Sequence, residues 1–224
     1  MQNDHQARPH RARNVTFVVL FVVFVGIGLI ALWAKLNSPS DLRFVSVEII
    51  GFEDDPDFDP KYGHDLLLRK EFLVSFSSDE DLIKFAQRFG YSMGIADLHD
   101  CASDKNPPDQ LGGGGYFYWE KLNTELAMKD DTYTKLAGQH VSGTPFIFKM
   151  YFSIKSPGND KGIVTFAPYD LQEKPMDLCF HVAGTNESFM SFRSNEVVIP
   201  KESFEAAFKR AGMTTASERK AIAR

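Results

Sequence analysis

The sequence contains few of the residues and motifs that identify an enzyme. Its 224 residues include only two cysteines, Cys101 and Cys179, and only two tryptophans. Neither cysteine belongs to a C-x₂₋₄-C knuckle, which structural zinc sites usually contain. There is no G-x-S-x-G motif, and Gly112–Gly115 is followed by Tyr-Phe-Tyr-Trp instead of the Gly-Lys-Ser/Thr of a phosphate-binding loop. Serine-hydrolase and P-loop chemistry are therefore not expected, and neither is a cofactor.

Basic residues are also in the minority. Beyond residues 1–34, the remaining 190 residues carry 22 Lys and Arg against 29 Asp and Glu, a formal charge of −7. Nucleic acid and anionic lipid headgroups both require a basic face, so we expect neither as a partner of this part of the chain. A basic protein partner or a cation remains compatible with the charge.

One long stretch lacks charge altogether. Val15–Ala34 is 20 residues long, with only Thr16 as a polar interruption. A helix of that length spans the roughly 30 Å hydrocarbon layer and offers no polar face to water. A cleaved signal peptide is the alternative, but its apolar region is usually about 7–15 residues and ends in a small-x-small site, where this chain has Leu29 or Leu32. The sequence predicts an uncleaved signal anchor, with the lipid bilayer as a partner.

The charges that flank this stretch predict its orientation. Arg8, Arg11 and Arg13 precede it, whereas only Lys35 and Arg43 follow closely, so the positive-inside rule places the N-terminus in the cytoplasm. The expected parts are a cytoplasmic tail (1–14), the transmembrane helix (15–34), a linker (35–42), an extracytoplasmic domain (43–212) and a flexible tail (213–224). We expect a bacterial inner membrane with the domain in the periplasm; a eukaryotic type II protein that faces the secretory lumen has the same features.

Apolar periodicity predicts an α+β domain with a mainly antiparallel sheet of five to seven strands and two or three packed helices. Strands are expected at Arg43–Ile50, Glu71–Phe76, Tyr91–Leu98, Pro145–Lys155, Gly162–Ala167, Asp177–Ala183, Ser188–Arg193 and Glu196–Ile199. Helices are expected after the N-cap Ser78, with Asp81 completing a capping box, at Tyr116–Lys129 and at Lys201–Ala211. If Tyr91–Leu98 returns beside the first strand, a β-α-β-like unit results.

The two cysteines are the most informative pair in the domain. Cys101 lies two residues after His99, and Cys179 two residues before His181, so on strands each pair shares a face. A disulfide between Cys101 and Cys179 is the preferred interpretation, because an extracytoplasmic domain meets an oxidising compartment. The alternatives are a zinc site made by both cysteines and both histidines, or a cysteine nucleophile activated by a histidine. Either would indicate a zinc- or thiol-dependent hydrolase.

Two loops are candidates for partner binding. The first is acidic and contains Asp54, Asp55, Asp57 and Asp59. It is not a calcium loop of the EF-hand type, because Pro60 and Leu66 occupy the positions that require Gly and Glu. The second loop, Pro107–Trp119, ends in aromatic residues that are typical interface anchors, namely Tyr116, Tyr118 and Trp119.

Together, these features predict a membrane-tethered, extracytoplasmic, non-catalytic protein-binding domain. A periplasmic immunity protein and an adaptor in an envelope complex are concrete forms of such a protein. The hydrolase that would use His99, Cys101, Cys179 and His181 is the alternative.

Overall fold

The computed structural model divides the chain into two compact units, Met1–Ser38 and Pro39–Arg224. The residues that it describes are 17, 19–26, 28–29, 32, 38–51, 70–103, 109–112, 115–120, 122–123, 131–156, 158, 167–187 and 190–214. The predicted acidic loop, residues 54–59, lies outside this set.

The first unit contains the apolar stretch. Residues 19–26 are helical, and their apolar side chains are exposed; Phe24, for example, is 71% exposed. Within the described residues, no helix is both long enough and apolar enough to cross a membrane. Several residues of the expected span Val15–Ala34 lie outside the described set, so the transmembrane helix stays a prediction.

The second unit has the expected α+β composition and is built on antiparallel strands. One five-stranded sheet, here called sheet A, has the order β1-β2-β7-β5-β6. Its strands are β1 (Arg43–Gly51), β2 (Lys70–Ser78), β7 (Phe146–Ser153), β5 (Phe117–Trp119) and β6 (Leu122–Asn123). The alternation that predicted β1 and β7 arises because each of these strands has one face directed to the core.

The second sheet, sheet B, also has five strands. It has the order β11-β10-β3-β4, with β12 paired to β10. Its strands are β3 (Ser92–Asp100), β4 (Gln110–Gly112), β10 (Leu178–Thr185), β11 (Ser191–Arg193) and β12 (Val197–Ile199). A two-stranded ribbon joins β8 (Lys155–Ser156) to β9 (Tyr169–Asp170). The expectation of a single sheet is therefore wrong, because the strands divide between two sheets.

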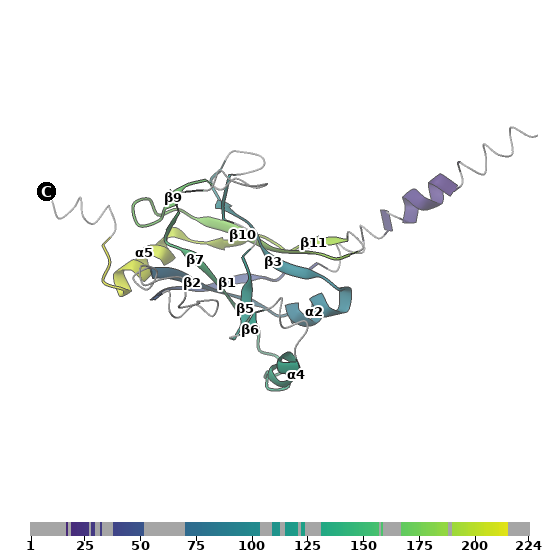
Figure 1. The fold of residues 1–224 in the computed structure, drawn as a ribbon, viewed down its shortest axis with the longest axis horizontal. Helices are drawn as coiled ribbons and strands as arrows, with labels where there is room; N and C mark the ends of the chain where they lie inside the picture. The colour runs from purple at the N-terminus through teal and green to yellow at the C-terminus, as the bar shows by residue number, and fades with distance from the viewer. Residues whose placement is uncertain are drawn as a thin grey trace, which may run out of the picture. The chain divides into compact units, whose positions relative to one another are not determined.

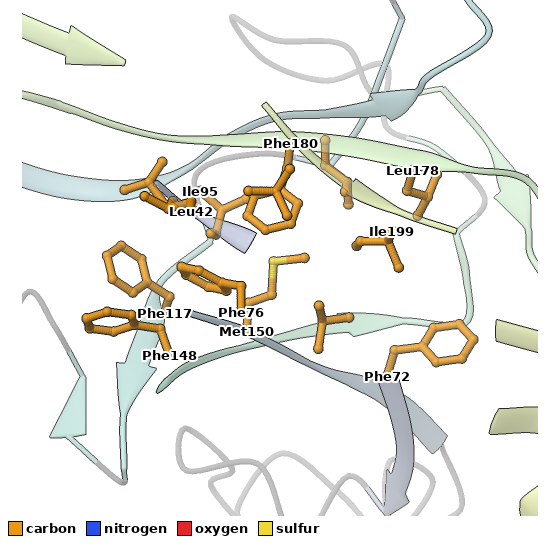
Figure 2. Packing of buried hydrophobic residues seen from close by; sticks show 14 of the residues in the cluster. Leu42, Phe72, Phe76, Ile95, Phe117, Phe148, Met150, Leu178, Phe180 and Ile199 are labelled. Carbon is orange, nitrogen blue, oxygen red and sulfur yellow. The ribbon is translucent and has the colours of Figure 1, made fainter. Parts of the chain in front are cut away.

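The two sheets bury their apolar faces against each other (Figure 1). Figure 2 shows Phe180, from sheet B, directed toward Phe76, Phe117 and Phe148, from sheet A. The ring of Phe76 lies 5.4 Å from that of Phe180 and 5.6 Å from those of Phe117 and Phe148. Such contacts contribute about 0.5–1.5 kcal/mol each beyond the area that they bury. Phenylalanine is abundant in this sequence, with 20 residues, and several of these side chains form the contact between the two sheets.

The C-terminal helix extends this core. Helix α5 (Lys201–Arg210) confirms the predicted amphipathic helix, and its buried residues include Phe204 and Phe208. Both rings contact Phe72 of β2, at 4.8 and 5.4 Å. The helix therefore packs against sheet A through the stripe that its sequence periodicity indicated.

Two other expectations are wrong. Strand β3 pairs with β10 and not with β1, so no β-α-β-like unit forms. Where Tyr116–Lys129 was expected to be helical, the structure places β5 and β6. The physical reason is packing: three consecutive aromatic residues, Phe117–Trp119, are at most 5% exposed, and adjacent residues that are all buried suit a strand covered on both faces.

Helix α2 (Leu82–Phe89) begins one turn later than a cap at Ser78 implies. Its N-cap is Asp81, whose side chain accepts a hydrogen bond from the backbone N–H of Lys84 at 3.0 Å. Ser78 instead ends β2, and its hydroxyl donates to Asp41 at 3.0 Å. Asp81 also accepts from the hydroxyl of Tyr133 at 2.6 Å, which joins α2 to α4 (Asp131–Ala137). Burial and this carboxylate raise the pKa of Tyr133, so its hydroxyl remains a donor at neutral pH.

Replacement of Asp81 by alanine removes the cap and the partner of Tyr133 together. We expect the free energy of unfolding to fall by about 1–3 kcal/mol, measured by urea denaturation of the full-length protein. Asp79→Ala is the matched control, because it removes only an exposed ion pair with Arg43 and should change stability by less than about 1 kcal/mol. Equal losses in the two variants would contradict the assignment of Asp81 as the cap.

Candidate functional site

The outer face of sheet B carries the polar residues that the sequence singled out. In β10, Leu178, Phe180 and Val182 are fully buried toward the core, so the side chains of Cys179 and His181 point to the other face. Antiparallel pairing of β10 with β3 places His99 directly opposite Cys179. The pairing brings the predicted set of His99, Cys101, Cys179 and His181 together on one face.

The predicted disulfide between Cys101 and Cys179 is present. It closes over a sequence separation of 78 residues, with the Cα atoms 5.1 Å apart. The bond fixes the end of β3 to the start of β10, and the N–H of Cys101 adds a hydrogen bond to the carbonyl of Asp177 at 3.0 Å. In this oxidised form neither sulfur is a thiolate, so the four-ligand zinc site and the cysteine nucleophile are not formed.

The two imidazoles share one carboxylate. His99 Nε2 lies 3.7 Å, and His181 Nε2 3.5 Å, from the same oxygen of Glu196, Oε2. The histidine side chains are only 10% and 12% exposed, whereas that of Glu196 is 47% exposed. Glu196 was expected only as the start of a strand. Its position beside the histidines depends on the pairing of β12 with β10, which no local sequence pattern shows.

A β-bulge positions His99. The register between β10 and β3 shifts between Cys179 and His181, and Asp97 adopts a left-handed φ of 55°. Its carboxylate forms an ion pair with Arg193 at 3.0 Å and accepts a hydrogen bond from the side chain of Gln110 at 2.7 Å. Its carbonyl contacts Nδ1 of His99. A non-glycine residue in this conformation is held by its surroundings, and here the strained backbone lies beside a buried histidine.

The predicted aromatic anchors occupy three different environments. Tyr116 is 46% exposed. Tyr118 is 3% exposed and packs against Tyr151, with ring centroids 5.2 Å apart. Trp119 is 5% exposed and lines a pocket at the end of β5. Of these three residues, Tyr116 is exposed to solvent and Trp119 lines the pocket, whereas Tyr118 is buried.

That pocket, here called the Trp119 pocket, has a volume of about 700 Å³. Its wall is mainly apolar and includes Leu122, Leu136 and Ile147, with Glu120 and Val141 also among the lining residues. His140 stacks on the ring of Phe146 at 3.8 Å and lies 6.2 Å from the Trp119 ring. A hydrogen-bond contact of its Nε2 with the carbonyl of Thr144, at 2.9 Å, holds the imidazole in place. The pocket is thus a mainly apolar recess lined by residues of β5, β6, α4, the segment between α4 and β7, and the start of β7.

A second pocket of about 640 Å³ lies beside the β8–β9 ribbon. It is lined by both acidic and basic groups, among them Glu71, Lys155 and Asp170. Tyr169 also lines it and donates a hydrogen bond to the carbonyl of Ser153 at 2.9 Å. Burial, together with the charge of Glu71, raises the pKa of Tyr169 to about 12. Its hydroxyl is therefore a hydrogen-bond donor at neutral pH and not a base.

Removal of the disulfide should lower stability markedly. The unfolded chain loses the constraint of a loop of 78 residues, for which the chain-entropy relation gives about 4.5 kcal/mol. We expect Cys101→Ala/Cys179→Ala to shift the urea midpoint downward, and a dithiol reductant to shift the wild-type midpoint to the same extent. A reductant without effect on the wild-type midpoint would show that the bond does not contribute.

Comparison of the chain with protein-family models, with curated proteins and with solved structures finds no match.

Proposed function

We propose that this protein is a membrane-tethered, non-catalytic binding protein that presents its α+β domain to a protein partner outside the cytoplasm. The single observation that carries the proposal is the Trp119 pocket, an apolar recess of about 700 Å³ with a tryptophan in its wall. Recesses of this kind receive the aromatic or aliphatic anchor of a partner, and tryptophan is among the residues that contribute most to binding energy.

The chemistry around the pocket indicates what the partner offers. Glu120 and Gln139 supply polar groups beside the apolar wall, and Val141 is 67% exposed. Together with the formal charge of −7 beyond residue 34, this arrangement favours a partner with an apolar side chain next to a basic one. A toxin neutralised in the periplasm and a subunit of an envelope complex both fit this description.

Two features support the extracytoplasmic location. The disulfide Cys101–Cys179 is a bond that persists in oxidising compartments. The uncharged stretch Val15–Ala34, preceded by three arginines, suits a signal anchor with its N-terminus in the cytoplasm. We place the protein in a bacterial inner membrane with residues 43–212 in the periplasm.

Charge introduced into the apolar stretch should abolish membrane anchoring. Val22→Arg/Phe24→Arg puts two charges at the centre of the span, at a cost of about 2.5–3.5 kcal/mol each. We expect the wild type to remain in the membrane pellet after carbonate extraction and the variant to leave it. The control is Val45→Arg/Val141→Arg, which adds the same charge at exposed positions of the second unit. A wild-type protein recovered in the soluble fraction would contradict the anchor.

Partner binding should depend on the Trp119 pocket. We expect chemical cross-linking in native membranes, followed by affinity capture of the full-length protein and mass spectrometry, to recover a near-stoichiometric partner. Val141→Arg should reduce that recovery by at least about tenfold, because it places a bulky cation where a basic partner docks. Val45→Arg is the matched control, since Val45 is also an exposed valine, 48% exposed, on β1 and outside the pocket.

Three outcomes decide the proposal. Loss of the partner in Val141→Arg alone supports the pocket. Loss only when Asp54, Asp55, Asp57 and Asp59 are replaced by asparagine would move the interface to the acidic loop. Equal recovery in all variants, or no protein enriched above a tag-only control, would overturn the proposed function.

A further inference from the structure

The connection between β5 and β6 carries a strained residue in the wall of the Trp119 pocket. Trp119 pairs with Leu122, so only two residues join the strands, and Glu120 is the first of them. Its φ is 57°, in the left-handed region. Two-residue hairpin turns with a positive φ at this position favour asparagine, aspartate or glycine, because other residues adopt that conformation only with strain. A glutamate held there, in the wall of a pocket, indicates a role for its side chain.

The polar groups of the pocket favour a ligand that is rich in hydrogen-bond donors. Among the described residues that line the pocket, Glu120 is the only one with a formal charge, and its carboxylate only accepts. The Nε2 of His140 contacts the carbonyl of Thr144 at 2.9 Å. A carbonyl also only accepts, so this nitrogen carries the proton of the neutral ring, and Nδ1 keeps a lone pair. A positively charged donor group therefore complements this end of the pocket.

Trp119 supplies a fixed aromatic surface beside these acceptors. Its ring lies 5.6 Å from that of Phe146 and 6.0 Å from that of Tyr133, and the part that stays accessible lines the pocket. A guanidinium is planar, stacks on aromatic rings and forms two parallel hydrogen bonds with one carboxylate. An ammonium is a compact point charge and does not pair in this bidentate way. The combination of Trp119 and Glu120 therefore suits arginine better than lysine.

The pocket is larger than a single guanidinium requires. Its volume of about 700 Å³ lies within the range of about 300–1,000 Å³ that is typical of small-ligand sites, and Leu122, Leu136 and Ile147 supply an apolar wall. We propose that the pocket binds an arginine of the partner together with an adjacent apolar residue. The apolar side chain packs on that wall, while the guanidinium pairs with Glu120 and contacts Trp119. This inference rests on the proposed function, because it names the chemistry that the partner presents to the same pocket.

Acetyl-leucyl-arginine amide is the probe for the test, and the fluorescence of Trp119 is the readout. Trp33 is the only other tryptophan of the sequence, so in full-length Trp33→Phe protein, purified in detergent, the tryptophan signal comes from the pocket. We expect saturable binding of the arginine probe. The citrulline analogue keeps the shape but lacks the charge, and should bind about tenfold more weakly. The lysine analogue keeps the charge but lacks the planar fork, and should also bind more weakly than the arginine probe.

Two variants at position 120 separate recognition from a structural role. Glu120→Gln removes the charge and should abolish the preference for the arginine probe over the citrulline analogue. Glu120→Asn should do the same while it keeps or raises the melting temperature, because asparagine adopts a positive φ more readily than glutamate. Glu205→Gln is the matched control and should leave the preference unchanged, since Glu205 is exposed on α5 and is not among the residues that line the pocket.

Three results would overturn the inference: equal affinity of the arginine probe and its citrulline analogue, a preference for the lysine analogue, or an arginine preference that survives both changes at Glu120. Capture of the cross-linked partner is a separate measurement, so the failure of this inference and that of the proposed function are distinguishable. A partner captured through the pocket without any arginine preference would contradict this inference alone. An arginine preference without a captured partner would overturn the proposed function and leave the chemistry of the pocket as stated.

Discussion

The antiparallel pairing of β3 with β10 is the constraint on which both the core and the polar face of sheet B depend. On one side of these strands, Phe180 reaches across the core to Phe76. On the other side, the same strands carry the disulfide and both imidazoles. A slip of one residue in this register would exchange the two faces, so the apolar burial that stabilises the domain also fixes where the histidines lie.

The bulge at Asp97 allows β3 to direct Met93, Ile95 and Leu98 to the core and His99 to the outer face of sheet B. Met93 and Ile95 are buried in the core, and so is Leu98, although Leu98 comes five positions after Met93 and three after Ile95. An unbroken strand cannot direct such residues to one face, because its side chains alternate. The bulge adds one residue to β3 in the region of Asp97, whose φ is positive, and the residues after it therefore change face, so that Leu98 points to the core. The ion pair with Arg193 and the hydrogen bond from Gln110 hold the Asp97 carboxylate and offset the backbone strain.

Sequence periodicity was informative where an element has one buried face, and failed where it does not. It located β1, β7 and α5, which have such a face. It assigned a helix to the segment of Phe117–Trp119, because consecutive buried aromatic residues have neither period. Cys101 and Cys179 were paired correctly from their number and from the oxidising compartment that the sequence led us to expect. Glu196 was missed because only the pairing of β12 with β10 brings it to the histidines, and pairing between distant segments leaves no local trace.

The disulfide determines which reactive side chains the outer face of sheet B presents beside His99 and His181. With Cys101 and Cys179 oxidised, this face presents two imidazoles and the Glu196 carboxylate but no thiolate. In a reducing compartment the same backbone would instead present two thiols near those imidazoles. The proposed extracytoplasmic location therefore determines which side chains this face presents. An oxidising environment keeps the two sulfurs in the disulfide, and that bond holds the end of β3 against the start of β10, where His99 and His181 both lie beside Glu196.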